Sequence, residues 1–299
     1  MPAAKPPRRA LLIVNPGARR GNAPVEAALD RLRAAGIAVE EARSDSGDAS
    51  GEAFRAQAEG FDLAIVAGGD GTLCRAAPGI LASGLPLGIL PTGTANDLAR
   101  TLRIPPDLDA AARIIAAGHT RRIDVGSVND HPFFNVASIG LSVELARELS
   151  PGLKRRWGRI GYALAAIRVL MRARRFGAWI GEEGDAVVTR TLQIGVGNGV
   201  FYGGGTIVAA DAAIDDGHLD LYSLEMRRVW KLALMLPVFR AGTHGAWSEV
   251  RTARNVAFEI RTRKPRPVNA DGELLTRTPA RFRVHPAALE VFTPAPASD

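Results

Sequence analysis

The first 125 residues alternate short apolar runs with stretches in which apolar residues recur at helical spacing. Buried strands are predicted for four of these runs, at residues 11–14, 37–39, 63–67 and 87–90. Helices are predicted between them at residues 25–35 and 51–59, and the first of these ends at Gly36. This alternation predicts an open α/β domain built on a doubly wound parallel sheet.

After Asp124 the pattern changes, because short apolar runs are then separated by turns and not by long helices. Strands are predicted at residues 122–128, 132–137, 187–197, 219–224, 255–260 and 281–284. Such a series is typical of antiparallel sheets. We therefore predict a second, mostly antiparallel β domain in this part of the chain.

Residues 145–175 combine many basic side chains with apolar residues at helical spacing. One interpretation is an amphipathic helix that lies on an anionic membrane surface. The other, which we favour from the sequence, is a helix packed on the β domain with its basic face in water. A second short helix is predicted at residues 230–240.

A glycine-rich segment directly follows the third predicted strand. Residues 68–72, with the sequence GGDGT, come after the apolar run at 63–67, and a helical pattern starts near Leu73. Strand, glycine turn and helix together bring bare backbone close to a phosphate group. Asp70 can hold a divalent cation beside that anion. An ordinary tight turn has the same pattern, so one such segment is weak support for a phosphate site.

Two more loops of this kind lie in the first hundred residues. Residues 91–99 (PTGTANDLA) follow the strand predicted at 87–90, and residues 15–21 (NPGARRG) follow the strand predicted at 11–14. Loops at the carboxyl ends of neighbouring strands share one crevice in a doubly wound sheet. The three loops together therefore predict a binding site for nucleotide phosphates.

Composition narrows the class of protein further. The chain has 299 residues, of which 46% are hydrophobic and 23% charged, values that fit a folded globular protein. No apolar run reaches the length of a membrane span, no signal peptide is recognisable, and the single cysteine excludes an internal disulfide. We therefore expect a cytoplasmic location.

The net charge of +7 suits anionic lipids, polyphosphates or nucleic acid as partners. No nucleic-acid-binding motif is present, so nucleic acid is not an expected partner. A GC-rich genome explains the arginine-rich composition equally well.

Five motifs occur in a specific order: NP at residues 15–16, GGDGT at 68–72, GTAND at 93–97, DGHLD at 216–220 and DGE at 271–273. In this order they resemble the diacylglycerol kinase catalytic-domain family, which includes soluble bacterial diacylglycerol kinases and the sphingosine and ceramide kinases. The resemblance covers residues 10–293. The GGDGT motif alone is shared with NAD kinases and phosphofructokinases, whereas the ordered set is specific.

The resemblance implies two domains and an activity. The first is an α/β nucleotide-binding domain, residues 1–125 joined by a returning segment at 285–299; the second is a β-sandwich-like lipid-substrate domain at 126–284. The implied activity is an ATP-dependent, Mg²⁺-dependent lipid kinase with the nucleotide in a cleft between the domains. The acceptor would be a hydroxylated lipid such as diacylglycerol at the inner face of the membrane, contacted peripherally. The oligomeric state, a homodimer included, stays open.

The resemblance also assigns roles to individual residues. The nucleotide would be bound by residues after the first four strands: Asn15, Pro16, Gly17, Ser44, Gly68, Gly69, Asp70, Gly71, Thr72, Thr94 and Asn96. Asp70 and Asp97 would hold the catalytic Mg²⁺ directly or through water, with Asp97 counted among the catalytic residues. Asp271 or Glu273 would accept the proton of the lipid hydroxyl. Asp271 is preferred, although an Asp-Gly pair is also typical of a hairpin turn.

A second, structural Mg²⁺ is implied by the acidic segment at residues 215–220. Its ligands would be the Asp216 carboxylate and the backbone carbonyls of Ala213 and His218, because hard cations prefer oxygen. A polar hairpin loop is the alternative. The His218 imidazole is not an expected ligand, since no second His or Cys stands at zinc spacing.

One departure from the family pattern bears on the activity. The family continues its first glycine motif with Asn and Glu, where this chain has Cys74 and Arg75. Polar contacts to the nucleotide or to a lid are therefore in doubt, whereas the glycine turn is retained. The alternatives are a kinase that acts on a soluble acceptor such as NAD, and a nucleotide- or lipid-binding regulator that has lost catalysis.

Overall fold

The computed structural model describes residues 8–14, 23–42, 51–148, 168–181, 186–199, 201–202, 206–207, 213–227 and 249–296. The chain divides into two compact units. Unit 1 is Met1–Val125 with Pro286–Asp299, and unit 2 is Gly126–His285. The strands β5 (Thr120–Val128) and β18 (Ala280–Phe292) carry the chain from one unit to the other.

Some predicted elements cannot be compared with the structure. The helix predicted at residues 230–240 and most of the basic stretch at 145–175 lie outside the described residues. Among the residues that are described, no helix is both long enough and apolar enough to span a bilayer.

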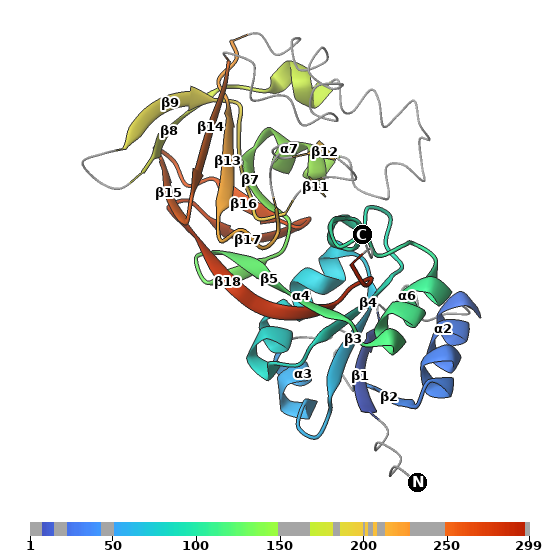
Figure 1. The fold of residues 1–299 in the computed structure, drawn as a ribbon. Coiled ribbons are helices and arrows are strands. Elements are labelled where there is room, and N and C mark those ends of the chain that lie inside the picture. The colour runs from blue at the N-terminus through green and yellow to red at the C-terminus, as the bar shows by residue number, and fades with distance from the viewer. Residues whose placement is uncertain are drawn as a thin grey trace. The chain divides into compact units, whose positions relative to one another are not determined.

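Unit 1 is built on a parallel sheet with the strand order β2-β1-β3-β4 (Figure 1). These strands are β1 (Arg8–Val14), β2 (Ile37–Glu41), β3 (Leu63–Gly68) and β4 (Leu87–Pro91). β3 and β4 are buried along their whole length, which explains why they are unbroken apolar runs in the sequence. The predicted parallel α/β architecture is confirmed.

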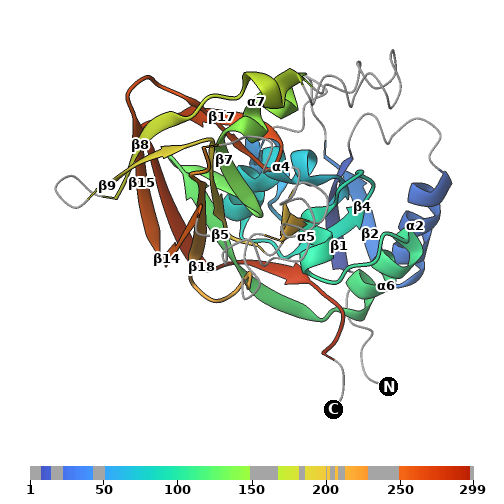
Figure 2. The same cartoon turned by 90° about the horizontal axis from the view of Figure 1, so that it is seen from above.

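Helices cover both faces of this sheet, as Figures 1 and 2 show. The helices of unit 1 are α2 (Ala23–Ala34), α3 (Gly51–Gln57), α4 (Asp70–Ser83), α5 (Asp97–Thr101) and α6 (Leu108–Ala117). α2 and α6 lie on one face, and α3 and α4 lie on the other. This cover leaves the carboxyl ends of the strands, where the glycine loops begin, as the polar edge of the sheet.

Unit 2 consists mainly of antiparallel strands in two sheets. One sheet has the order β14-β13-β10-β7-β16-β17. Its strands are β7 (Val136–Gly140), β10 (Gln193–Gly197), β13 (Leu219–Leu224), β14 (Val250–Asn255), β16 (Pro267–Ala270) and β17 (Glu273–Arg277). In the other, the start of β18 pairs with β15, followed by β8 and β9.

The strands that follow β18 in this second sheet are β15 (Ala257–Thr262), β8 (Phe176–Ile180) and β9 (Val187–Thr191). The other elements of unit 2 are β6 (His131–Phe133), α7 (Leu141–Glu148), β11 (Phe201–Tyr202) and β12 (Thr206–Ile207). β5 and β6 form a hairpin whose turn, Asn129-Asp130, has positive φ at both residues. Such a turn joins two antiparallel strands tightly, as the sequence predicts.

One hydrophobic cluster joins the two sheets of unit 2. Ile139 and Ile194 reach it from the first sheet, and Ala178, Ile260 and Phe282 reach it from the second. Residues from two sheets meeting in one buried core are typical of a β-sandwich. The predicted antiparallel, sandwich-like domain is therefore confirmed.

The strand boundaries differ from the predictions in several places. The run at 187–197 is two strands that break at Leu192, and the run at 132–137 is divided between β6 and β7. The predicted strand at 255–260 lies across the end of β14 and the start of β15, whereas the segments at 281–284 and 288–292 belong to one strand, β18. The spacing of apolar residues does not reveal these strand boundaries, because the same spacing continues where one strand ends and the next begins.

Candidate active site

The first glycine-rich segment forms the junction between β3 and α4. β3 ends at Gly68, and α4 begins at Asp70, three residues before the start predicted near Leu73. The backbone N–H groups of Thr72 and Leu73 donate to the carbonyl oxygen of Gly69 over 2.9 and 3.1 Å. The segment therefore includes the first turn of a helix, where backbone N–H groups and the helix dipole favour an anion.

The second loop runs from Pro91, the end of β4, to Asp97, the start of α5. Asn96 has φ 51°, and its side-chain Oδ1 accepts the N–H of Gly93 over 3.0 Å. Its Nδ2 donates back to the carbonyl oxygen of Gly93 over 2.8 Å. Asn96 thus closes the turn through its own side chain and leaves Thr94 exposed within it.

The two loops touch through Gly69 and Gly93. A methyl group added at Gly93 would lie 2.5 Å from the Cα of Gly69, and one added at Gly69 would lie 2.9 Å from the Cα of Gly93. Carbon atoms do not approach so closely without repulsion, so the contact requires bare backbone on both sides. The N–H of Thr92 also donates to the carbonyl oxygen of Gly68 over 3.1 Å. Neighbouring loops that are separate in sequence therefore form one surface.

Asp70 links this surface to the next helix. Its Oδ1 accepts the N–H of Leu98, in the first turn of α5, over 3.2 Å. Asp97 stands beside Leu98 in the chain and is 5% exposed. Unit 1 thus brings the Asp70 carboxylate together with both glycine loops and with the backbone next to Asp97.

Four of the predicted nucleotide-binding residues lie outside the described part of the chain: Asn15, Pro16, Gly17 and Ser44. Val14, which precedes them, pairs with Ala67 in the parallel ladder between β1 and β3. The chain therefore leaves β1 beside the end of β3. The assignments of these four residues stay predictions.

In unit 2, the predicted base Asp271 lies in the turn between β16 and β17, with φ 48°. Its Oδ2 accepts the N–H of Phe134 over 2.6 Å, and its Oδ1 accepts those of Asn135 and Val136 over 3.0 and 3.1 Å. Three N–H donors to one carboxylate fix its orientation. Asp271 therefore lies in a hairpin turn, and it is also the predicted catalytic carboxylate.

Sequence reasoning missed the segment that holds Asp271. Phe134 and Asn135, between β6 and β7, are held in turn by Asn198, which follows β10. The Asn198 Nδ2 donates to the carbonyl oxygen of Phe134 over 3.0 Å, and its N–H donates to that of Asn135 over 2.8 Å. Both asparagines are buried. The sequence marks these two residues only as asparagines that lie inside or at the end of an apolar run.

The alternative base, Glu273, is half-buried at the start of β17.

Asp216 lies in the turn before β13. Its carboxylate accepts the N–H groups of Ala213 and His218 over 3.2 and 2.9 Å. It also forms an ion pair with Arg254 of β14, whose Nε is 3.9 Å from Oδ1 of Asp220. A guanidinium group and two backbone donors therefore surround this carboxylate.

Comparisons with known proteins match the chain in two consecutive parts. Residues 9–128 match the family described as the diacylglycerol kinase catalytic domain. Residues 135–293 match the YegS C-terminal NAD kinase beta sandwich-like domain.

A diacylglycerol kinase from Staphylococcus aureus (strain MRSA252) is 30% identical to this chain over 292 residues, which are 96% of this chain and 93% of that protein. A diacylglycerol kinase from Staphylococcus aureus (strain bovine RF122 / ET3-1) matches with the same identity and coverage. The chain belongs to the diacylglycerol kinase family. It is accordingly a transferase of the lipid-kinase type.

Solved structures show the same architecture as this diacylglycerol kinase family member. The crystal structure of a diacylglycerol kinase from Bacillus anthracis str. Sterne superposes with a TM-score of 0.75 at 26% identity, and covers 97% of this chain and 98% of that one. Another chain from the same organism superposes with a TM-score of 0.80 at 26% identity, and covers 99% of this chain and 100% of its own. The likeness therefore extends over both units.

The loops of this diacylglycerol kinase family member fit a catalytic Mg²⁺. Mg²⁺ in kinases usually takes one or two carboxylates and completes its shell with water and phosphate oxygens. Asp70, held in place by the N–H of Leu98, supplies one such carboxylate, and the assignment of Asp97, which precedes Leu98 and is 5% exposed, stays a prediction. No group of three or more His, Cys, Asp or Glu is placed to hold a metal within the described ranges, so further ligands would come from water and substrate.

The contacts of Asp216 fit a bound cation less well than those of Asp70 do. Arg254 already neutralises the carboxylate, and the N–H groups of Ala213 and His218 donate to its two oxygens. The structural Mg²⁺ site stays a prediction, and the described geometry favours Arg254 as the counter-charge.

The two residues that depart from the family pattern lie in α4. Cys74 is buried at 4% exposure, as expected for a small core residue and not for a nucleophile. Arg75 is exposed on the same helix. Neither side chain disturbs the backbone contact between the glycine loops.

We expect Gly93→Ala to destabilise unit 1 by roughly 1–3 kcal/mol, because the added methyl group overlaps the backbone of the facing loop. Urea unfolding measures the change, and nucleotide titration should show weaker binding. Gly177→Ala is the matched control, because a methyl group there meets nothing within 4 Å. Equal unfolding midpoints for Gly93→Ala and the wild type would contradict the contact.

We expect Arg254→Gln to lower the unfolding midpoint by about 2–4 °C, the shift that loss of about 1 kcal/mol produces in a domain of this size. The physical cause is loss of the cation beside the partly buried Asp216 carboxylate. Mg²⁺ should stabilise the wild type no more than it stabilises Asp216→Asn, because Arg254 already pairs with Asp216. Arg283→Gln removes an exposed guanidinium elsewhere in unit 2 and serves as control. A rise with Mg²⁺ that is larger in the wild type than in Asp216→Asn would restore the structural-ion assignment, because Mg²⁺ bound near Asp70 would stabilise both proteins alike.

Proposed function

We propose that this chain transfers the γ-phosphate of ATP to a hydroxyl group of a membrane lipid such as diacylglycerol, with Mg²⁺ as cofactor. The observation that carries the proposal is the backbone contact between Gly69 and Gly93 at the start of α4. In a member of the diacylglycerol kinase family, bare backbone at a helix N-terminus is suited to bind the phosphates of a nucleotide.

Phosphoryl transfer depends on positioning and charge neutralisation more than on covalent chemistry. The N–H groups in the first turn of α4 and around Thr94 would bind phosphate oxygens. Asp70 and Asp97 would hold Mg²⁺, which neutralises phosphate charge when it is bound. The resemblance adds Asn15 and Ser44 to the nucleotide-binding set.

On the acceptor side, the proton of the lipid hydroxyl must move to a base. The hydroxyl oxygen forms a bond to the γ-phosphorus while the bond from that phosphorus to the ADP oxygen breaks. Asp271 is the preferred base, because three backbone N–H groups hold its carboxylate in a fixed orientation. Glu273, two residues further along the same hairpin, is the alternative. The acceptor lipid would be reached at the membrane surface by peripheral contact.

The direct test is transfer of radiolabelled phosphate from Mg-ATP to diacylglycerol in mixed micelles. We expect Asp70→Asn to lower kcat by roughly 10²-fold or more, because it removes the cation-binding charge. The Asn side chain keeps an oxygen for the N–H of Leu98, so the fold is retained. Asp130→Asn in the β5–β6 turn is the control with the same change of charge. Transfer to NAD and to no lipid would instead favour the soluble-acceptor alternative, and ATP binding without turnover would favour a regulator.

A second comparison separates the two candidate bases. Asp271→Asn should lower kcat by roughly 10²–10⁴-fold, and should also destabilise unit 2 by roughly 2–4 kcal/mol because an amide cannot accept all three N–H bonds. Glu273→Gln should retain more activity and melt like the wild type. Rates are compared well below both melting midpoints, so that unfolding does not enter. If Glu273→Gln alone abolishes turnover, Glu273 is the base.

A further inference from the structure

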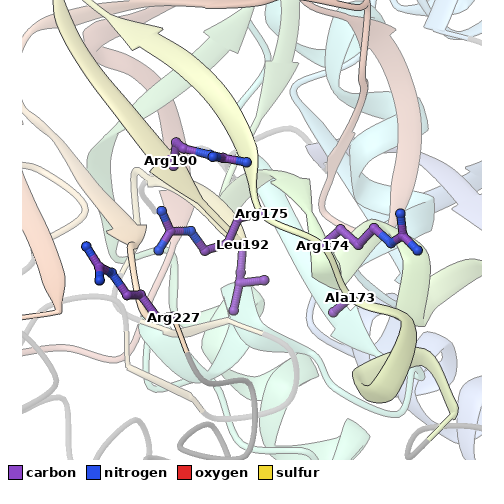
Figure 3. A pocket seen from close by; sticks show the side chains of 6 residues that line it. All are labelled: Ala173, Arg174, Arg175, Arg190, Leu192 and Arg227. Carbon is purple, nitrogen blue, oxygen red and sulfur yellow. The ribbon is translucent and has the colours of Figure 1, made fainter.

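A basic pocket in unit 2 involves none of the residues assigned to phosphoryl transfer. It has a volume of about 400 Å³ and is lined by Ala173, Arg174, Arg175, Arg190, Leu192 and Arg227 (Figure 3). These residues come from the segment before β8, from β9, from the break between β9 and β10, and from the segment after β13. Cavities of this volume commonly hold small ligands or parts of larger ones.

The apolar side of the pocket is held rigidly. Leu192 is 3% exposed, and its N–H donates to the carbonyl oxygen of Leu224 over 2.8 Å. The hydroxyl group of Thr191 donates to the same carbonyl over 3.0 Å. Ala173 packs against the hydrophobic cluster that contains Leu192 and Leu224. Because hydrogen bonds and packing already fix this apolar side, a ligand that binds there does not pay the entropy of ordering it.

Three of the arginines gather around Leu192. In Figure 3, the side chains of Arg175 and Arg227 extend to the same side of Leu192, and Arg190 lies above them. Arg174 extends to the opposite side in this view. The Nη1 of Arg175 donates to the carbonyl oxygen of Glu225 over 3.4 Å, which limits its movement. Arg190 and Arg227 are exposed and can turn toward a ligand.

Among the described residues that line this pocket there are four arginines and no acidic residue, so their positive charge is not balanced within this set. Glu225 is near Arg227 in the chain, but its carboxylate pairs with Arg251, whose Nε lies 2.6 Å from Oε1. That hydrogen bond raises the pKa of Arg251. Within the described ranges, no carboxylate forms an ion pair with any of the four lining arginines.

The chemistry of the lining specifies the ligand. Several guanidinium groups around one cavity repel one another and bind a phosphate group, whose oxygens accept paired N–H bonds. The lining residues that the structure describes include no aromatic side chain on which a nucleobase could stack. Leu192 and Ala173 offer apolar contact to a glycerol moiety or to the first carbons of an acyl chain.

We propose that this pocket binds the phosphate-bearing headgroup of an anionic membrane lipid, a lipid other than the acceptor. The inference rests on the proposed function only in that the chain works at a lipid surface. Headgroup binding in unit 2 would hold the protein at the membrane independently of the nucleotide.

The test measures binding to vesicles without ATP. Full-length protein is sedimented with vesicles of phosphatidylglycerol in phosphatidylcholine, and with phosphatidylcholine alone. The variant Arg175→Gln/Arg190→Gln/Arg227→Gln should bind the anionic vesicles about tenfold or more weakly than the wild type, since each basic side chain near such a surface contributes substantially. The wild type should show little binding to phosphatidylcholine alone.

A matched control separates the pocket from the net charge of the protein. Arg263→Gln/Arg277→Gln/Arg283→Gln removes the same charge from exposed positions of unit 2 outside the pocket. We expect this control to lose less than about threefold in affinity, because distant charges are screened by salt. Should the pocket variant fail to fold, the single variants Arg190→Gln and Arg227→Gln provide the same comparison at exposed sites.

Equal losses in the pocket variant and the control would overturn the proposal, because net charge would then explain binding. A free phosphate site would also overturn it: in calorimetry with inorganic phosphate, the pocket variant would lose binding while its vesicle binding stayed unchanged. The proposed kinase activity is tested separately. A protein that binds vesicles through the pocket but transfers no phosphate leaves this inference standing and refutes the other.

Discussion

The backbone contact between Gly69 and Gly93 is the constraint on which the candidate site depends. It joins the ends of β3 and β4, and no side chain larger than hydrogen is accommodated on either side. The contact also places Asp70 where its carboxylate accepts the N–H of Leu98 at the start of α5. One close approach of two main chains therefore sets the positions of two helix N-termini and of the carboxylates beside them, which is what a phosphate and its cation require.

Carboxylates that the sequence marks for chemistry also serve as anchors for backbone N–H groups. Asp70 binds the start of α5, Asp271 binds the segment at 134–136, and Asp216 binds its own turn. A carboxylate fixed by backbone donors cannot rotate freely, so its orientation is set before any ligand binds. A substitution at such a position is therefore expected to change stability as well as any chemistry that the carboxylate performs. For that reason, variants that keep an acceptor oxygen are more informative than truncation to alanine.

The sequence was sufficient for the fold class and for the clustering of the two glycine loops, because both follow from local rules. An unbroken apolar run predicts a buried parallel strand, and loops after neighbouring strands must meet at one edge of the sheet. The start of α4 at Asp70 was missed, since glycine disfavours helix and hides a helix that tertiary contacts support. The partners of Asp271 were also beyond the sequence: they are main-chain groups 135–137 residues away, and backbone donors leave no mark in residue identity. The arginines at 175, 190 and 227 are also far apart in the chain, so only the folded arrangement shows them as one pocket.

The path of β18 has a consequence for the order in which the protein is made. Its last residues complete unit 1, where Val291 pairs with Leu87 and the N–H of Thr293 donates to the carbonyl oxygen of His119. During synthesis on the ribosome, residues 1–125 emerge long before this strand exists. Unit 1 must therefore wait, with one side of β4 unpaired, while the whole of unit 2 is translated. Unpaired strand edges attract other chains, so this interval is where a nascent polypeptide of this kind would most depend on chaperones.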